Sequence, residues 1–267
     1  MQAPATPRYR KTLLERSGVG RQVSTGMRMV IRNVEHRPWR SLFTVTGIAL
    51  AVALQISGAF WMDAMDHIME VQFQQVQRGD VVVQFQNAVS PSVVQDLQRM
   101  PGVIHAEANR TEAVRIHARG VSEEGALLGL HACARLLRPV DALQGPVPVP
   151  AQGLLMSDLL ARQLAVRVGD RVEVAFLMGR QTRAQVEVVG VVHTLMGKQV
   201  FMSLDAMNRL SREGSAVTEA SLRVDAALMP AFWSAVKQAP EIVAVFDKAS
   251  EMASFQASTS RNMGIFS

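Results

Sequence analysis

An uninterrupted apolar stretch, LFTVTGIALAVALQISGAFWM, runs from Leu42 to Met62 and dominates the sequence. Its 21 residues carry no formal charge, and Gln55 is their one strongly polar side chain. A helix of that length is about 30 Å long, which matches the hydrocarbon core of a bilayer. Trp39 and Trp61 flank it at the depths where indole rings favour the headgroup region. We therefore expect one transmembrane helix over residues 41–63.

Two other interpretations fit this stretch less well. A core helix of a soluble protein is rarely apolar on every face. A signal peptide would not follow 41 residues of charged, patterned sequence. With 48% hydrophobic residues, the chain of 267 residues is too polar for a bundle of several spans. Its composition is typical of a water-soluble domain attached to one membrane-spanning helix.

The net charge of +5 is divided unevenly along the chain. Residues 1–40 contain nine Lys or Arg and two Glu, a balance of +7, whereas the remaining 19 basic and 21 acidic residues leave −2. Basic residues close to a span favour the cytoplasmic side. The sequence thus predicts a cytoplasmic N-terminus and a periplasmic or extracellular main domain. Nucleic-acid binding would also explain the basic residues, but no aromatic platform or known motif accompanies them.

The segments on either side of the span have helical patterns. Residues 1–40 begin as a basic leader, and four of its apolar residues follow the spacing of one helical face: Met27, Val30, Ile31 and Val34. A basic amphipathic helix before a span is expected to lie in the cytoplasmic interface, although a packed surface helix shows the same pattern. Residues 64–80 keep helical spacing and predict a stalk.

Four small or polar residues lie on one side of the predicted span: Gly47, Ala51, Gln55 and Gly58. Small residues let a second helix approach closely, and an amide can hydrogen-bond across such a contact. These residues are therefore the candidate face for packing against other membrane helices. Gly and Ala are common in membrane helices in any case, so the pattern has low specificity.

The segment after the stalk contains an internal repeat, in which residues 82–107 match residues 221–246 at a constant offset of 139. The offset pairs Pro91 with Pro230 and Pro101 with Pro240. It also pairs four apolar positions: Val83 with Leu222, Phe85 with Val224, Leu97 with Val236, and Val103 with Ile242. Each copy has an alternating strand, a Pro near a helix start, an amphipathic helix, a second Pro and another β-rich run. We therefore predict one βαβ unit per copy.

The fold class that follows is α+β, with a core domain over residues 81–257. Two βαβ-like halves, about 81–119 and 216–250, flank a β-rich insert at about 120–215. The insert includes strands over 125–131, 168–176 and 185–192, and a separate strand is expected over 111–119. Residues 258–267 turn apolar and predict the start of a second membrane helix that the chain lacks.

The sequence contains no motif typical of a catalytic, cofactor-binding or metal-binding site. There is no phosphate-binding G-x-x-x-x-G-K-[ST] loop, no H-E-x-x-H and no G-x-S-x-G. The histidines show no metal-ligand spacing, Cys133 is the only cysteine, and Glu123 and Glu124 are expected in a solvated loop. We expect no enzyme activity in this chain.

Two stretches resemble a known family. RNVEHRPWRSLFTVTGIALAVAL resembles the first membrane helix of a repeat in FtsX-like permeases of ATP-binding cassette systems. QGLLMSDLLARQLAVRVGDRVEV, followed by VVGVV and FMSLDAMNRL, resembles the MacB-like periplasmic core domain. The resemblance covers about residues 25–267. In that family the extracytoplasmic domain is inserted between the first two helices of a four-helix unit, and two βαβ-like halves flank a smaller β-rich subdomain.

The resemblance implies the membrane subunit of an exporting or extracting machine in the cell inner membrane. Its substrate would be a lipid, lipoprotein, peptide or drug, or the machine would regulate cell-wall enzymes. The implied partners are the lipid bilayer, a separate ABC ATPase, and a second permease unit from another subunit or from a second repeat of the same chain. An extracytoplasmic protein partner is also possible in such systems. The remaining helices are absent, so we expect a fragment or a truncated product. A single-pass anchored binding or scaffold module without transport is the alternative.

Overall fold

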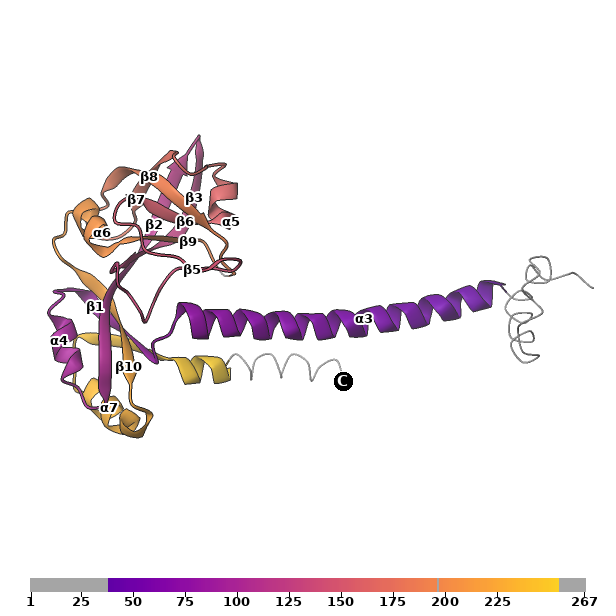
Figure 1. Cartoon of the computed structure of the whole chain (residues 1–267), viewed down its shortest axis with the longest axis horizontal. Coiled ribbons are helices and arrows are strands. Elements are labelled where there is room, and N and C mark those ends of the chain that lie inside the picture. Colours follow the sequence, from indigo (N-terminus) through magenta and orange to yellow (C-terminus); the bar gives the residue numbers. More distant parts are fainter. Residues whose placement is uncertain (1–37, 196, 255–267) are drawn as a thin grey trace, which may run out of the picture. The chain divides into compact units, whose positions relative to one another are not determined.

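The computed structural model of the protein describes residues 38–195 and 197–254, and the chain divides into two units between Met65 and Asp66. Two predicted elements lie outside the described residues: the amphipathic helix before Pro38 and the second membrane helix over 258–267. Mixed helices and strands follow a long N-terminal helix, as the α+β class requires (Figure 1).

The long helix α3 (Pro38–Glu70) contains the whole predicted span 41–63. It continues into one π-helical segment, η2 (Val71–Val76), which ends where the Gln77 N–H donates to the Gln72 carbonyl. The predicted stalk 64–80 is therefore helical only to Val76, and an irregular link leads to the first strand.

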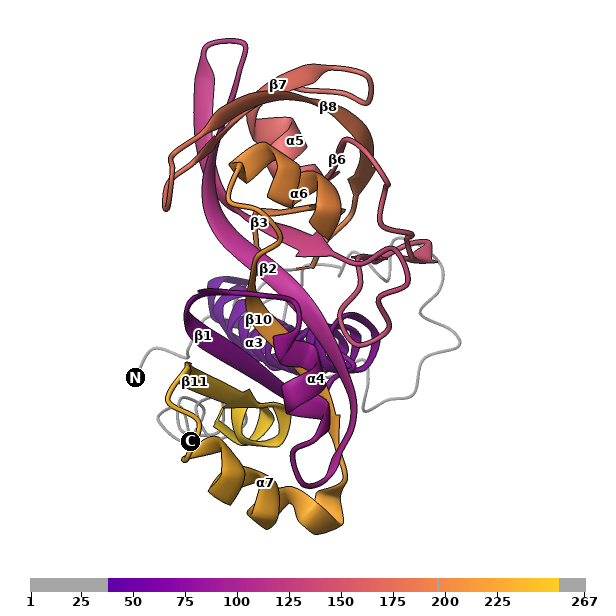
Figure 2. The same cartoon turned by 90° about the vertical axis from the view of Figure 1, so that its left-hand side faces the viewer.

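The two repeat copies each fold as strand, helix, strand. Their strands interleave in the antiparallel order β11-β1-β10-β2, so that a strand of one copy lies between the two strands of the other (Figure 2). This is the split βαβ arrangement. The elements of the first copy are β1 (Val81–Val89), α4 (Val93–Gln98) and β2 (Val103–Ala118). Those of the second are β10 (Val217–Val224), η3 (Ala226–Leu228), α7 (Met229–Val236) and β11 (Ile242–Asp247).

The strands of the insert form a closed ring with the second half of β2. Their ladder runs β2-β3-β9-β6-β8-β7 and returns from β7 to β2. Closure leaves this ring without a free edge. The strands are β3 (Val121–Leu130), β6 (Leu154–Ser157), β7 (Arg171–Phe176), β8 (Arg183–Val192) and β9 (Gln199–Ser203). Two short helices, α5 (Asp158–Gln163) and α6 (Leu204–Ser211), pack on it, and β4 (Val140–Asp141) pairs with β5 (Gly145–Pro146).

Strand β2 belongs to both parts of the domain. Its first half pairs with β10, and its second half pairs with β3 and β7. The prediction of a separate strand over 111–119 was therefore wrong at its start, because β2 runs unbroken for 16 residues. Its inward positions keep one parity throughout, from Ala106 and Ala108 to Val114 and Ile116. A continuous alternation of this kind holds one strand in register across two cores.

A second local prediction also needs correction, because Glu123 and Glu124 do not lie in a loop. They belong to β3, where the Glu124 Oε1 accepts from Arg115 at 2.5 Å and the Glu123 Oε2 accepts from Lys198 at 2.6 Å. The turn lies immediately before β3, at Arg119 and Gly120. Arg119 and Gly120 have φ of 50° and 81°, a left-handed pair typical of a two-residue hairpin.

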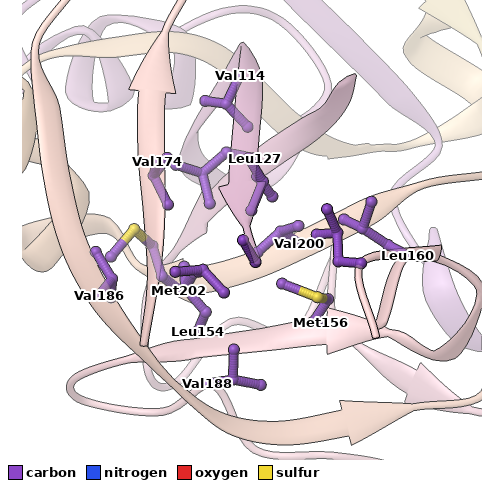
Figure 3. Close-up of a cluster of buried hydrophobic side chains, with 14 of the residues drawn as sticks. Val114, Leu127, Leu154, Met156, Leu160, Val174, Val186, Val188, Val200 and Met202 are labelled. Atoms are coloured by element: carbon purple, nitrogen blue, oxygen red, sulfur yellow. The ribbon is translucent and has the colours of Figure 1, made fainter. Parts of the chain in front are cut away.

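Two main hydrophobic cores stabilise these parts. The ring encloses Leu127, Leu154, Met156 and Leu160, all with exposures of 0% (Figure 3). The second core lies between the four-stranded sheet and its two helices, and includes Leu97 and Phe232. A smaller cluster on the outside of the ring holds Leu130 and Phe201.

Candidate functional site

The apolar helix is the first candidate site. In the described part of the chain, Pro38–Val76 is the one helix long and apolar enough to cross a membrane, with a mean hydropathy of 1.8 over its best window. Its large apolar side chains are exposed, Leu54 and Phe60 to 74% and 73%. Such a surface is stable in lipid and unfavourable in water.

The predicted packing residues share one side of α3. At about 100° per residue, Gly47, Ala51, Gln55 and Gly58 fall within an arc of about 80°. A Cβ added at Gly47 or Gly58 would meet no atom within 4 Å. The helix therefore brings the four residues together as an open face, and its role in packing remains a prediction.

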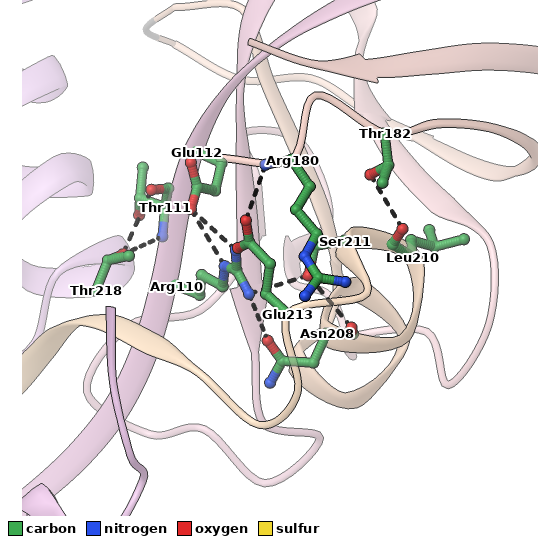
Figure 4. Close-up of polar contacts among 10 residues, drawn as sticks. All are labelled: Arg110, Thr111, Glu112, Arg180, Thr182, Asn208, Leu210, Ser211, Glu213 and Thr218. Carbon is green, nitrogen blue, oxygen red and sulfur yellow. Dashed lines mark hydrogen bonds and ion pairs between the residues drawn. The ribbon is translucent and has the colours of Figure 1, made fainter. Parts of the chain in front are cut away.

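A buried ion cluster occupies the point where β2 leaves the four-stranded sheet and enters the ring (Figure 4). The guanidinium of Arg110 is 1% exposed and pairs with the carboxylates of Glu112 and Glu213. Its Nη1 also donates to Asn208 Oδ1 at 2.8 Å and to Ser211 Oγ at 3.1 Å. Arg110 thus connects β2 to α6 and to the segment that leads back to β10.

Glu213 extends this cluster to the turn between β7 and β8. Its Oε1 accepts from the Arg180 backbone N–H at 3.0 Å, while its Oε2 accepts from Arg110. Burial tends to raise the pKa of the Glu213 carboxyl, but the hydrogen bond from Arg110, the Arg180 N–H and the two positive charges lower it below its ordinary value. The cluster has no nucleophile with an adjacent base, so its chemistry is that of a structural lock.

An open groove of about 860 Å³ lies beside β2. It is bounded by α4, the segment after β3, and the start of α6. Its polar lining includes His105, Glu107, His131 and Arg209, together with the exposed thiol of Cys133. No cluster of three metal-ligating side chains occurs here or elsewhere among the described residues.

One carboxylate fixes the linker between β3 and β6. Asp141, 4% exposed, accepts the backbone N–H groups of His193, Leu143 and Gln144 at 2.9, 2.8 and 3.1 Å, and it contacts His193 Nδ1 at 3.0 Å. Burial tends to raise the pKa of Asp141, but these hydrogen bonds outweigh it and lower the pKa to about 2.

Four residues that hold the domain together were not predicted from the sequence: Arg110, Glu213, Asp141 and Glu107. A signal existed for Arg110, since it has the same parity as the buried residues Ala108 and Val114 of its strand. An arginine at an inward strand position predicts a buried partner carboxylate. The identity of that carboxylate cannot be predicted in the same way, because Arg110 and Glu213 are more than 100 residues apart in the chain.

One family model matches most of the chain. The model of the MacB-like periplasmic core domain matches residues 41–259. No protein of curated function matches the chain. Among solved structures, the extracellular domain of the noncanonic ABC-type transporter YknZ from Gram-positive bacteria is 14% identical, with a TM-score of 0.39; the match covers 55% of this chain and 83% of that one. The periplasmic region of MacB from Actinobacillus actinomycetemcomitans is 10% identical, with a TM-score of 0.42, covering 66% and 91%.

Proposed function

Because the chain belongs to the family of MacB-like periplasmic core domains, we propose that it is part of the permease subunit of an ATP-binding cassette transport system. In this proposal the apolar helix α3 is one span of the permease, and residues 81–257 form its extracytoplasmic domain. The transported substrate belongs to the lipids, lipoproteins, peptides or drugs. The chain itself does not hydrolyse ATP; a separate ATPase does.

One observation carries the proposal. The family match starts at residue 41, inside the apolar helix, and continues through the folded domain to residue 259. The helix and the domain are therefore matched as a single unit, which fits a membrane subunit better than a secreted domain. The exposed apolar surface of the helix supports the same view, since residues such as Phe43 and Leu54 need lipid or other helices around them.

The topology and the partners follow from charge and from the family. The balance of +7 over residues 1–40 favours a cytoplasmic N-terminus, and the domain after the span then lies outside the inner membrane. A second permease unit would complete the bundle and cover the face of Gly47, Ala51, Gln55 and Gly58. An extracytoplasmic protein partner would meet the folded domain.

The test is copurification from native membranes. The product of the complete gene, tagged at one end, is solubilised in mild detergent and purified at physiological salt. We expect an ATPase subunit with a phosphate-binding loop to copurify, and the complex to hydrolyse ATP. An unrelated single-pass protein with the same tag and the same expression level is the control. Recovery of the tagged protein without any ATPase would overturn the transport proposal and favour an anchored binding or scaffold module.

A further inference from the structure

The segment after β3, residues 131–138, contacts both the groove and the end of the long helix, and we call it the strap. Its residues from His131 to Arg135 line one wall of the groove. Its other end pairs with residues 75–79, which we call the stalk end. Two parts of the domain that are distant in sequence therefore meet through these eight residues.

Backbone hydrogen bonds hold the strap to the stalk end. The Leu136 carbonyl accepts from the N–H groups of Arg78 and Gly79 at 2.7 and 3.1 Å. In the other direction, the Arg138 N–H donates to the Val76 carbonyl at 3.2 Å, and the Arg138 Nε donates to the Gln75 carbonyl at 3.1 Å. The bonds to Gln75 and Val76 satisfy carbonyls at the C-terminal end of the helix, where intrahelical donors run out.

A single side chain of β2 holds the strap to the sheet. The carboxylate of Glu107 is 10% exposed and accepts the N–H of Leu136 at 2.9 Å and the N–H of Arg135 at 3.0 Å to each oxygen. His105 Nε2 lies 3.0 Å from its Oε1. Within the described part of the chain, the amides of Arg135 and Leu136 donate to no other acceptor.

Leu136 therefore connects two contacts in series through its own N–H and its own carbonyl. Its N–H is bound to Glu107, and its carbonyl is bound to Arg78 and Gly79. These two groups belong to consecutive peptide planes that share the Leu136 Cα, so a displacement at one contact is passed directly to the other. The strap also packs on the outside of the ring through Ala134 and Leu137.

We propose that Glu107 makes the strap a mechanical link between the stalk end and the groove. Residues 77–80 lead directly into β1 and attach the stalk end to the four-stranded sheet. The strap adds a second attachment, to the ring and to the groove wall. Movement of the stalk end thus reaches both parts of the domain, and a ligand in the groove touches the segment that holds the stalk. The use of this link in transport rests on the proposed function.

The link is tested by hydrogen exchange on the purified chain in detergent micelles. Glu107→Gln keeps the shape of the side chain but removes its charge. We expect the amides of Arg135 and Leu136 to exchange at least tenfold faster, and those of Arg78 and Gly79 as well, although Glu107 does not touch them. A spin label on the native Cys133, which is exposed on the strap, should become more mobile.

Glu219→Gln is the matched control, since the Glu219 carboxylate accepts from Gln84 and Thr111 and from no amide of the strap. It should leave exchange at all four amides unchanged. Faster exchange at Arg135 and Leu136 alone would overturn the proposal, as would no change at any of the four. Equal acceleration at ring amides such as Val174 would do the same, because it would indicate general destabilisation. None of these readings requires an ATPase, so they remain informative if the proposed function fails.

Discussion

Val82 and Ser221, which are equivalent positions of the two repeat copies, lie directly opposite each other in the ladder between β1 and β10. Their neighbours follow the same symmetry, since Val81 faces Leu222 and Val83 faces Ala220. A local two-fold axis therefore passes between Val82 and Ser221. The pairing of β1 with β10 is therefore centred on two residues that are 139 positions apart, which is the offset of the repeat in the sequence.

The outer strands keep the same relation, including its irregularity. Val82 pairs with Phe246 in β11, and its equivalent Ser221 pairs with Glu107 in β2. The register shifts between Gln84 and Phe85 in one ladder, and between the equivalent Arg223 and Val224 in the other. A shared β-bulge marks the two copies as one structural unit used twice.

The shared strand β2 predicts that the two cores unfold together. Leu127→Ala, in the ring, should lower the free energy of unfolding by about 2–5 kcal/mol, because it leaves a cavity at a fully buried site. Trp233 reports on the other core when Trp39 and Trp61 are replaced by Phe. We expect its fluorescence transition in denaturant to move with the circular dichroism transition. A Trp233 transition that stays in place would show that the cores are independent.

The buried arginine predicts a large loss of stability on substitution. Arg110→Met should cost about 3 kcal/mol, the lower end for a broken buried ion pair, since Glu112 and Glu213 remain partly hydrated. Arg115→Met, in an exposed pair with Glu124, is the control and should cost less than about 1 kcal/mol. Urea unfolding at pH 7 measures both. Similar small losses for the two variants would refute the role of Arg110 as a lock.

Asp141 predicts a pH dependence of stability. Its pKa in the folded chain is about 2, below the ordinary value of 3.8, so its contribution is present above about pH 4 and is lost as the pH falls through 2. Asp141→Asn should therefore cost about 1–2 kcal/mol at pH 7, with allowance for solvent screening. The difference from the parent chain should shrink between pH 4 and pH 2. Asp96→Asn, at an exposed carboxylate, should change little at either pH.

The proposed topology predicts where a cysteine reacts. Ser122 lies exposed near the tip of the β2–β3 hairpin. In a Cys133→Ala background, Ser122→Cys should react with a membrane-impermeant maleimide in intact cells once the outer envelope is permeable. Cys133, itself exposed, should react in the same way in the parent chain. Reaction only after lysis of the inner membrane would reverse the orientation.

The candidate helix face predicts an asymmetry between two substitutions in α3. Ala51→Leu should reduce recovery of partner subunits from solubilised membranes, because the larger side chain wedges a close helix contact apart. Ile48→Leu, outside that face and 60% exposed, should be nearly silent. Loss of the Gln55 amide should matter less than the wedge, since such hydrogen bonds contribute about 0.6 kcal/mol on average. Equal recovery with both leucine variants would remove this face from the assembly.

Local patterns in the sequence were enough to predict the apolar helix, the repeat and most strands. The residues that form each of these elements are neighbours in the chain. A repeat of apolar residues every 3.6 or every 2 positions therefore predicts a helix or a strand directly. Proline positions located the helices of both copies, since Pro91 precedes α4 and Pro230 lies in the first turn of α7. The same reasoning failed for Glu123 and Glu124, because the stretch GVSEEG suggested a loop although each glutamate has a partner across the sheet.

Only the tertiary structure decided how the elements combine. The interleaved order β11-β1-β10-β2, the closure of the ring on the second half of β2, and the meeting of Arg110 with Glu213 depend on contacts between residues far apart in the chain. The strap is of the same kind, since Glu107 and Leu136 belong to segments with separate local patterns. Hydrophobic periodicity indicates which face of a strand is buried. It does not indicate which element covers that face, because every possible partner would require the same apolar pattern. The partner is chosen by the packing of the whole domain.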